Sequence, residues 1–133
     1  MKHQGLAHIA VLTKDMEQTI AFYEMLGGAC KQRASVQKPA GVNLLAMIDM
    51  GGFWIEAIQP GDGTLVDANG GVLPHIAIEV DDVAACGAQL RELGVDTFLT
   101  AEPVVLPEVF GGLSNWFFTG PSGEQIELIQ HFA

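Results

Sequence analysis

Positively charged residues are scarce in this chain of 133 residues, which has 6 Lys and Arg against 16 Asp and Glu and a formal net charge of −10. A surface of this charge repels phosphate backbones, so the composition argues against nucleic acid as a partner. No basic amphipathic stretch indicates binding to a membrane surface. An anionic substrate would have to be held by a few local cations, because phosphates and carboxylates are commonly bound by Lys or Arg.

Cysteines and long hydrophobic runs are scarce as well. Cys30 and Cys86 are the two cysteines, fewer than the disulfide framework of a small secreted domain usually needs, and no CxxC pattern occurs. We therefore expect both to be reduced core residues. The chain has no run of about 18 apolar residues, as a membrane span requires, and its first residues lack the features of a signal peptide. We expect a cytoplasmic protein.

An internal repeat organises the chain. Residues 6–28, LAHIAVLTKDMEQTIAFYEMLGG, correspond at an offset of 67 to residues 73–95, LPHIAIEVDDVAACGAQLRELGV. GFWIEAIQ and GEQIELIQ, which end the two copies, correspond at an offset of 71. The composition, 49% hydrophobic and 17% charged, is that of a folded domain. We predict one domain over 1–133, built of a module at 1–59, a Gly- and Asp-rich linker at 60–72, and a module at 73–133.

The residue pattern predicts one strand, one helix and three further strands in each module, an α+β fold. Asp15 and Asp82 suit helix N-caps, and Gly27 and Gly94 suit helix ends. Strands are expected at 5–12, 30–37, 43–50, 53–59, 73–80, 96–101, 115–119 and 125–130, with turns at Gly51-Gly52 and 121–123. The remaining segment, 101–115, fits either a lid over a site or an ordinary connecting loop.

Two histidines and two glutamates recur at matching positions, His8 with His75 and Glu56 with Glu127. Strand side chains alternate between faces, so each His and Glu should lie opposite the β-branched face that packs on the helix. Four such groups on mostly apolar sheet faces are costly to bury unless a cation compensates. A single strand histidine is more often a core residue, but the repetition favours a metal site. We predict one divalent ion of Ni, Co, Zn, Mn or Fe, bound by His8, Glu56, His75 and Glu127.

The motifs LAHIAVLTKDMEQTIAFYEMLGG, WIEAIQP, PHIAIEVDDV and FFTGPSGEQIELIQ together resemble the vicinal oxygen chelate superfamily, which includes glyoxalase I, bleomycin resistance proteins and extradiol dioxygenases. The resemblance implies two βαβββ modules that form an open, barrel-like mixed sheet with helices on the outside. It also implies that His8, Glu56, His75 and Glu127 occupy the four metal-ligand positions of glyoxalase I-like enzymes. The full set is closest to the lyase and isomerase branch.

The function predicted from this resemblance is that of a glyoxalase I-like lyase or isomerase acting on a small molecule. Glu127 or Glu56 would take a proton next to a carbonyl, and the metal would stabilise the enediolate. The alternatives are an extradiol-type dioxygenase, an epimerase of an acyl thioester, and a non-catalytic binding protein of the bleomycin-resistance type. A homodimer is expected. Candidate substrate contacts, for which a core role is the commoner alternative, are Trp54, Phe110, Trp116 and Phe118.

Overall fold

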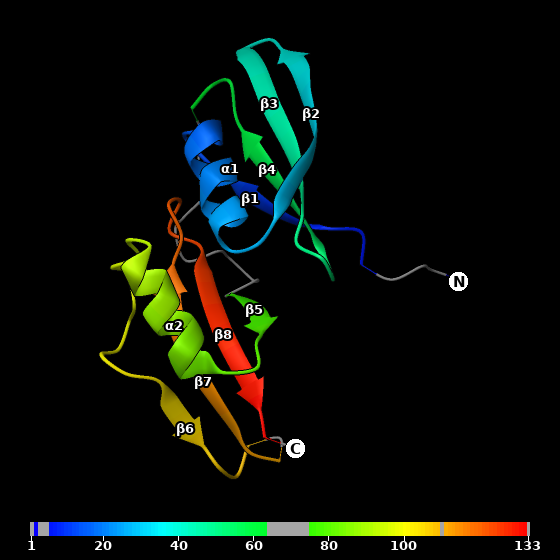
Figure 1. Cartoon of the computed structure of the whole chain (residues 1–133). Helices are drawn as coiled ribbons and strands as arrows, with labels where there is room; N and C mark the ends of the chain where they lie inside the picture. The colour runs from blue at the N-terminus through cyan, green and yellow to red at the C-terminus, as the bar shows by residue number, and fades with distance from the viewer. Residues whose placement is uncertain (1, 3–5, 64–74, 110, 133) are drawn as a thin grey trace. The chain divides into compact units, whose positions relative to one another are not determined.

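Residues 2, 6–63, 75–109 and 111–132 are described by the structure, a computed structural model of the chain. The chain divides into two compact units, Met1–Asp67 and Ala68–Ala133, and each contains one of the predicted modules (Figure 1). Residues 64–72 of the predicted linker lie outside the described residues.

Each module contains one helix and four strands in the order βαβββ. In the first module these are β1 (Ile9–Leu12), α1 (Met16–Met25), β2 (Ala29–Lys38), β3 (Gly41–Asp49) and β4 (Trp54–Gln59). In the second module they are β5 (Ile76–Glu79), α2 (Val83–Glu92), β6 (Val104–Leu106), β7 (Leu113–Thr119) and β8 (Gln125–His131). The predicted α+β class and the repeated element order are therefore confirmed.

The two sheets have the same topology. Their strand orders are β1-β4-β3-β2 and β5-β8-β7-β6, so the first strand of each module lies beside the last. That pair is parallel, and the other neighbours are antiparallel, which makes each sheet mixed. The first and last strands of each repeat, within or next to which the predicted ligands lie, are consequently hydrogen-bonded neighbours.

The helices begin in the same way in both modules. The carboxylates of Asp15 and Asp82 accept a backbone N–H from the first helical turn at 3.0 and 2.9 Å, which confirms both as N-caps. The side-chain oxygens of Gln59 and Gln130 accept the N–H of the first helical residue at 2.8 and 3.1 Å. These N–H groups have no partner within the helix. The repeated glutamine thus ties each helix to the last strand of its module. Within the described part of the chain, no helix has the length and apolarity that crossing a membrane requires.

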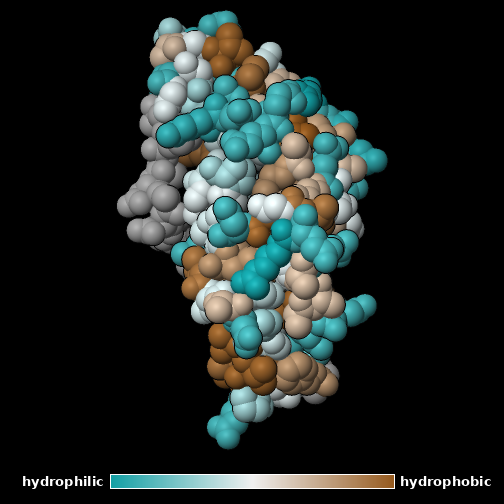
Figure 2. Space-filling model, turned by 60° about the vertical axis from the view of Figure 1, so that its left-hand side comes forward, coloured by the Kyte–Doolittle hydropathy of each residue, from teal (hydrophilic) through white to brown (hydrophobic). Residues whose placement is uncertain are grey.

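The core of each module lies between the helix and one face of its sheet, since α1 contacts β3 and β4 while α2 contacts β7 and β8. Ile55 and Ala57 in β4 and Ile126 in β8 are completely buried, and Leu128 in β8 is nearly so. Between them stand Glu56 and Glu127, whose side chains point to the other face because strand residues alternate. Hydrophobic side chains also reach the surface, and Figure 2 shows them interspersed with hydrophilic ones.

One predicted strand is wrong. Residues 96–101 form only an isolated bridge to β7, and the second strand of the second module is β6, farther along the chain. The carbonyl oxygens of Thr100 and Ala101 accept hydrogen bonds from the side chains of Trp116 and Arg91, at 3.0 and 2.9 Å. Side-chain donors thus satisfy these carbonyls, which a sheet ladder would otherwise satisfy.

Gly87 allows α2 to approach β7 closely, and this contact gives a stability prediction. A Cβ at Gly87 would lie 2.3 Å from two ring carbons of Trp116, whose side chain is buried. Alanine normally stabilises a helix by about 1 kcal/mol relative to glycine. Here the overlap forces the ring or the helix to shift, which costs about 1–3 kcal/mol. We therefore expect Gly87→Ala to lower the free energy of unfolding measured in urea.

Gly52→Ala is the matched control, because nothing lies within 4 Å of a Cβ at Gly52. This variant is expected to unfold at the urea concentration of the wild type or slightly above it. A Gly87→Ala protein as stable as the Gly52→Ala protein would show that α2 does not pack on Trp116 as described.

Candidate metal centre

The first module brings His8 and Glu56 together on the face of its sheet opposite α1. His8 directly precedes β1 instead of lying within it, and Ala10 of β1 is the register partner of Glu56. Because side chains alternate along a strand, His8, Ala10 and Glu56 share one face. His8 Nε2 lies 3.5 Å from Glu56 Oε1, and the two side chains are 36% and 23% exposed.

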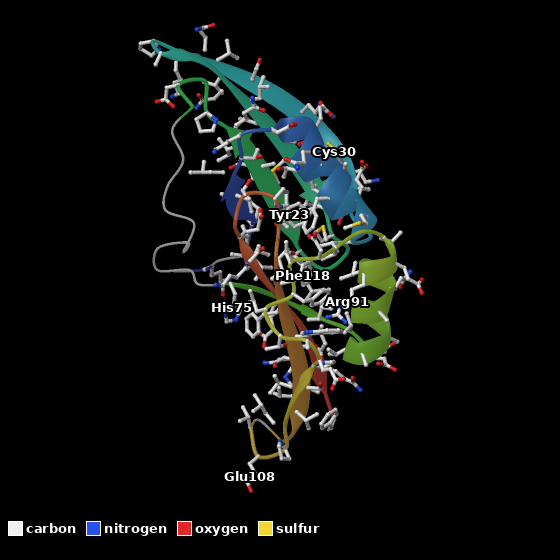
Figure 3. The ribbon with its side chains drawn as sticks, turned by 90° about the vertical axis from the view of Figure 1, so that its left-hand side faces the viewer. Tyr23, Cys30, His75, Arg91, Glu108 and Phe118 are labelled. Carbon is white, nitrogen blue, oxygen red and sulfur yellow. The ribbon has the colours of Figure 1, made fainter. Side chains whose placement is uncertain are left out.

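The second module repeats this arrangement with His75 and Glu127. His75 directly precedes β5, and Ala77 is the register partner of Glu127. His75 Nε2 lies 3.4 Å from Glu127 Oε1, with side-chain exposures of 37% and 10%. Figure 3 shows His75 on one side of β7 and β8 and Arg91, on α2, on the other. The two modules therefore build the same His–Glu pair from equivalent strands.

The geometry of each pair fits two ligands of one metal ion. Separations of 3.4 and 3.5 Å between nitrogen and oxygen are longer than an ordinary hydrogen bond. Two donors bound at about 2.1 Å and at right angles on one ion lie about 3 Å apart. Imidazole nitrogen and carboxylate oxygen are both ligands of divalent transition metals. In the described part of the chain, no third His, Cys, Asp or Glu joins either pair. Each module thus brings two candidate ligands together, and their binding of a shared ion stays a prediction.

Asn115 and Phe117 of β7 lie beside the second pair, and neither was predicted from the sequence. Asn115 Nδ2 donates to Glu127 Oε2 at 2.8 Å. Phe117 is the register partner of Glu127, and its ring meets the His75 ring edge-on, with 5.3 Å between the centroids. Strand alternation along residues 113–119 places both on one face, but only the packing of Trp116 against α2, seen in the structure, shows that this face is the one that carries Glu127.

The four predicted substrate contacts have different environments in the structure. Trp54 of β4 is half-buried and shares a face with Glu56, two residues away. Trp116 and Phe118 are 3% and 0% exposed and lie on the helix side of their sheet, so they are core residues and face away from Glu127. Phe110 lies outside the described residues.

The segment that was expected to be a lid or a connecting loop is partly sheet. β6 forms three register pairs with β7 and is the edge strand of the second sheet. The part of the segment that contains β6 is therefore fixed in the sheet, and a lid is not supported there.

Both arginines of the chain are engaged in contacts of their own. The guanidinium of Arg91 stacks on the rings of Phe98 and Trp116, 5.2 and 4.6 Å from their centroids. Arg33 forms a two-pronged ion pair with Glu17, which holds the pKa of that carboxyl below its usual value. Neither arginine is positioned to hold a substrate at the His–Glu pairs of its module.

The cysteines are free, as predicted, but they are half-buried and not fully in the core. Burial raises the pKa of the Cys86 thiol, with a smaller contribution from the negative charge of Asp82. A thiol with a raised pKa stays protonated at neutral pH and is a poor nucleophile. Cys86 is therefore no candidate for covalent catalysis.

A hollow of about 550 Å³ in the first module lies apart from the histidine pair. It is formed where the β2–β3 turn meets the end of β4, and neither His8 nor Glu56 lines it. Its lining residues are Leu12, Lys38, Pro39, Ala40, Gly41, Asn43, Pro60 and Asp62. The chemistry of the His–Glu pair and this hollow are thus separate features of the module.

Comparisons with known proteins give one family and one fold. The model of the glyoxalase/bleomycin resistance protein/dioxygenase superfamily matches residues 7–108, a range that includes His8, Glu56 and His75. None of the curated proteins matches the chain at the sequence level.

Solved structures share the fold over nearly the whole chain. A glyoxalase family protein from Bacillus cereus is 17% identical with a TM-score of 0.79, covering 100% of this chain and 97% of that one. A glyoxylase/bleomycin resistance protein/dioxygenase domain from Frankia is 17% identical with a TM-score of 0.74, covering 98% and 99%. The fosfomycin resistance protein FosX from Listeria monocytogenes, in complex with Mn(II) and sulfate, is 20% identical with a TM-score of 0.67, covering 97% and 93%. Identities this low establish the fold alone.

Proposed function

As the chain belongs to the glyoxalase/bleomycin resistance protein/dioxygenase superfamily, we propose that it is a divalent-metal-dependent lyase or isomerase of the glyoxalase I type. The observation that carries this proposal is the pair of His and Glu that each module builds on equivalent strands, with separations of 3.5 and 3.4 Å. A protein that binds a small molecule without a metal would not require the same His–Glu pair in both modules.

In this proposal His8, Glu56, His75 and Glu127 hold one cation. The pairs come from one chain or, in a homodimer that exchanges modules, from two chains, and both arrangements give the same ligand set. Mn(II) is the first ion to test, because FosX holds it in the same fold. Ni, Co, Zn and Fe accept the same donors.

The reaction moves a proton on a carbon next to a carbonyl group. A cation in this site would supply a Lewis acid for the negative charge that develops on the carbonyl oxygen. Glu56 or Glu127 takes the proton as general base. Return of that proton to the neighbouring carbon, together with transfer of the hydroxyl proton to the former carbonyl oxygen, gives an isomer, and return to the same carbon gives an epimer. Trp54 and Phe117, on the faces that carry Glu56 and Glu127, offer apolar contacts to the substrate and exclude water.

The substrate class is a small carbonyl compound of low charge. The net charge of −10 disfavours polyanions, and both arginines are engaged elsewhere in their modules. The hemithioacetal that methylglyoxal forms with a small neutral thiol is therefore the first probe. A substrate with several phosphates would need several local cations, and the chain has 6 Lys and Arg in all.

Metal removal tests the proposed function. Protein stripped with a chelator is expected to lose turnover of the hemithioacetal and to regain it with one equivalent of the correct ion per chain. The measurement is metal analysis followed by turnover with Mn, Ni, Co, Zn and Fe(II) in turn. Oxygen uptake with Fe(II) and a catechol, without hemithioacetal turnover, would show a dioxygenase. A protein that binds none of these ions would contradict the proposal and favour a binding protein.

A further inference from the structure

The two His–Glu pairs have different neighbours in their sheets, and one of these differences concerns a hydrogen-bond donor. In the second module Asn115 is the register partner of Ile129, two residues beyond Glu127. In the first module the partner of Ile58, two residues beyond Glu56, is Leu45. A donor side chain thus stands beside one carboxylate, and a hydrocarbon side chain stands at the same place beside the other.

Asn115 fixes the orientation of the Glu127 carboxylate. Its amide donates to Oε2 at 2.8 Å, while Oε1 lies 3.4 Å from His75 Nε2. One oxygen is therefore held by the protein, and the other is directed to the place where a shared ion with His75 would lie. Glu127 is only 7% exposed, so few other positions are open to it.

Glu56 lacks such a restraint. Leu45 cannot donate a hydrogen bond, and among the described residues no amide or hydroxyl group donates to the Glu56 carboxylate. Its side chain is 23% exposed, against 10% for that of Glu127. Glu56 can therefore change its rotamer without breaking a hydrogen bond to the protein, whereas Glu127 cannot.

We propose that Asn115 is a positioning residue that keeps Glu127 as the permanent carboxylate ligand, and that Glu56 is the carboxylate that exchanges the substrate proton. This inference rests on the proposed function. When the substrate C–H bond breaks, the proton forms an O–H bond on Glu56, and the electron pair delocalises onto the carbonyl oxygen. Return of the proton to carbon restores the Glu56 carboxylate, so no oxidant or reductant is needed. A carboxylate that acts as the base has to leave the cation in order to accept the proton. This movement is easier for Glu56, because no hydrogen bond restrains its carboxylate.

Exchanging the two equivalent residues tests the proposal. Asn115→Leu removes the donor at similar side-chain volume, and Leu45→Asn places one beside Glu56. Loss of a hydrogen bond that orients a ligand typically weakens metal binding about 10–100-fold. We expect Asn115→Leu to raise the Mn²⁺ dissociation constant by that factor in calorimetric titration and to lower kcat at saturating Mn²⁺ by a smaller factor. We expect Leu45→Asn to leave the Mn²⁺ dissociation constant nearly unchanged and to lower kcat about 10-fold or more, because Glu56 becomes restrained.

Two controls separate positioning from folding. The thermal midpoint of each metal-free variant shows whether the module still folds. Asn115→Gln, which keeps the amide donor, is expected to recover part of the Mn²⁺ affinity that Asn115→Leu loses. A role in folding alone would lower the metal-free midpoint and kcat together, without the selective loss of affinity.

The outcomes separate this inference from the function on which it rests. Wild-type protein that binds no Mn²⁺ or other divalent ion overturns both. Wild-type protein that binds Mn²⁺ with the same affinity as a folded Asn115→Leu variant overturns the role of Asn115 alone. A folded Leu45→Asn variant with unchanged kcat, while the wild type is active, overturns the role of Glu56 as the proton acceptor.

Discussion

Replacing Glu56 with Gln is expected to lower kcat for the hemithioacetal by about 10²–10⁴-fold, the range that a general base contributes. Gln keeps the shape and a carbonyl oxygen that can still contact a cation, but it cannot accept the substrate proton. The Mn²⁺ dissociation constant should therefore change much less than kcat. Steady-state kinetics at saturating Mn²⁺, together with calorimetric titration of the metal, measures the two effects separately.

Glu127→Gln is the matched comparison, because both substitutions remove one negative charge from one His–Glu pair. Here the larger effect should be on metal affinity, since Asn115 donates a 2.8 Å hydrogen bond to the Glu127 carboxylate and thereby orients the proposed ligand. Part of the turnover should return when Mn²⁺ is raised. If Glu127→Gln loses turnover at every Mn²⁺ concentration while Glu56→Gln remains active, the assignment of the two carboxylates is reversed.

Replacing His75 with Ala is expected to weaken Mn²⁺ binding by about 100-fold or more, because one of the four proposed ligands is lost together with its contact to Glu127. His8→Ala should have an effect of the same size, since the first module builds the same pair at 3.5 Å. The measurement is competition with a fluorescent chelator of known affinity, and it does not require the substrate.

His131→Ala is the control for both histidine variants. His131 lies on β8, on the same face as Glu127, but its Nδ1 lies 2.9 Å from Glu79 and takes no part in the His75 pair. The Mn²⁺ affinity of the His131→Ala protein should equal that of the wild type. Equal affinities in the His8→Ala, His75→Ala and His131→Ala proteins would mean that the two pairs are not the metal site.

The repeat in the sequence predicted the features that depend on local pattern. The offset of His8 from His75 and of Glu56 from Glu127 located the equivalent strands, and alternation placed each pair opposite the helix. Asp15 needed only its own neighbours to be recognised as an N-cap. These predictions succeeded because the interactions that fix them lie within a few residues or recur in both copies.

The errors arose where distant side chains decide the local structure. Residues 96–101 have the composition of a strand, but the side chains of Arg91 and Trp116 donate hydrogen bonds to the carbonyl oxygens of Ala101 and Thr100. Trp116 was a candidate substrate contact with a core role as the commoner alternative, and the packing of its ring against Gly87 favours the core role. These contacts join segments that lie apart in the sequence, so a local sequence pattern does not predict them.

The role of Asn115 could not be predicted from the sequence for a related reason. Its importance depends on two registers, that of Asn115 with Ile129 and that of Leu45 with Ile58. The repeat alignment matches the first and last strands of the modules, but the strands between them show no clear identity. Only the sheet ladders show that Asn115 and Leu45 are equivalent.

A crystal structure of the Mn²⁺-loaded protein, phased with the anomalous signal of manganese, tests the central claim most directly. We predict one strong anomalous peak for each set of His8, Glu56, His75 and Glu127, with His nitrogen and Glu oxygen atoms at about 2.0–2.2 Å from it. The density will also show whether one chain or two supply the set. Separate peaks at the two His–Glu pairs, or a peak that touches neither, would contradict the account.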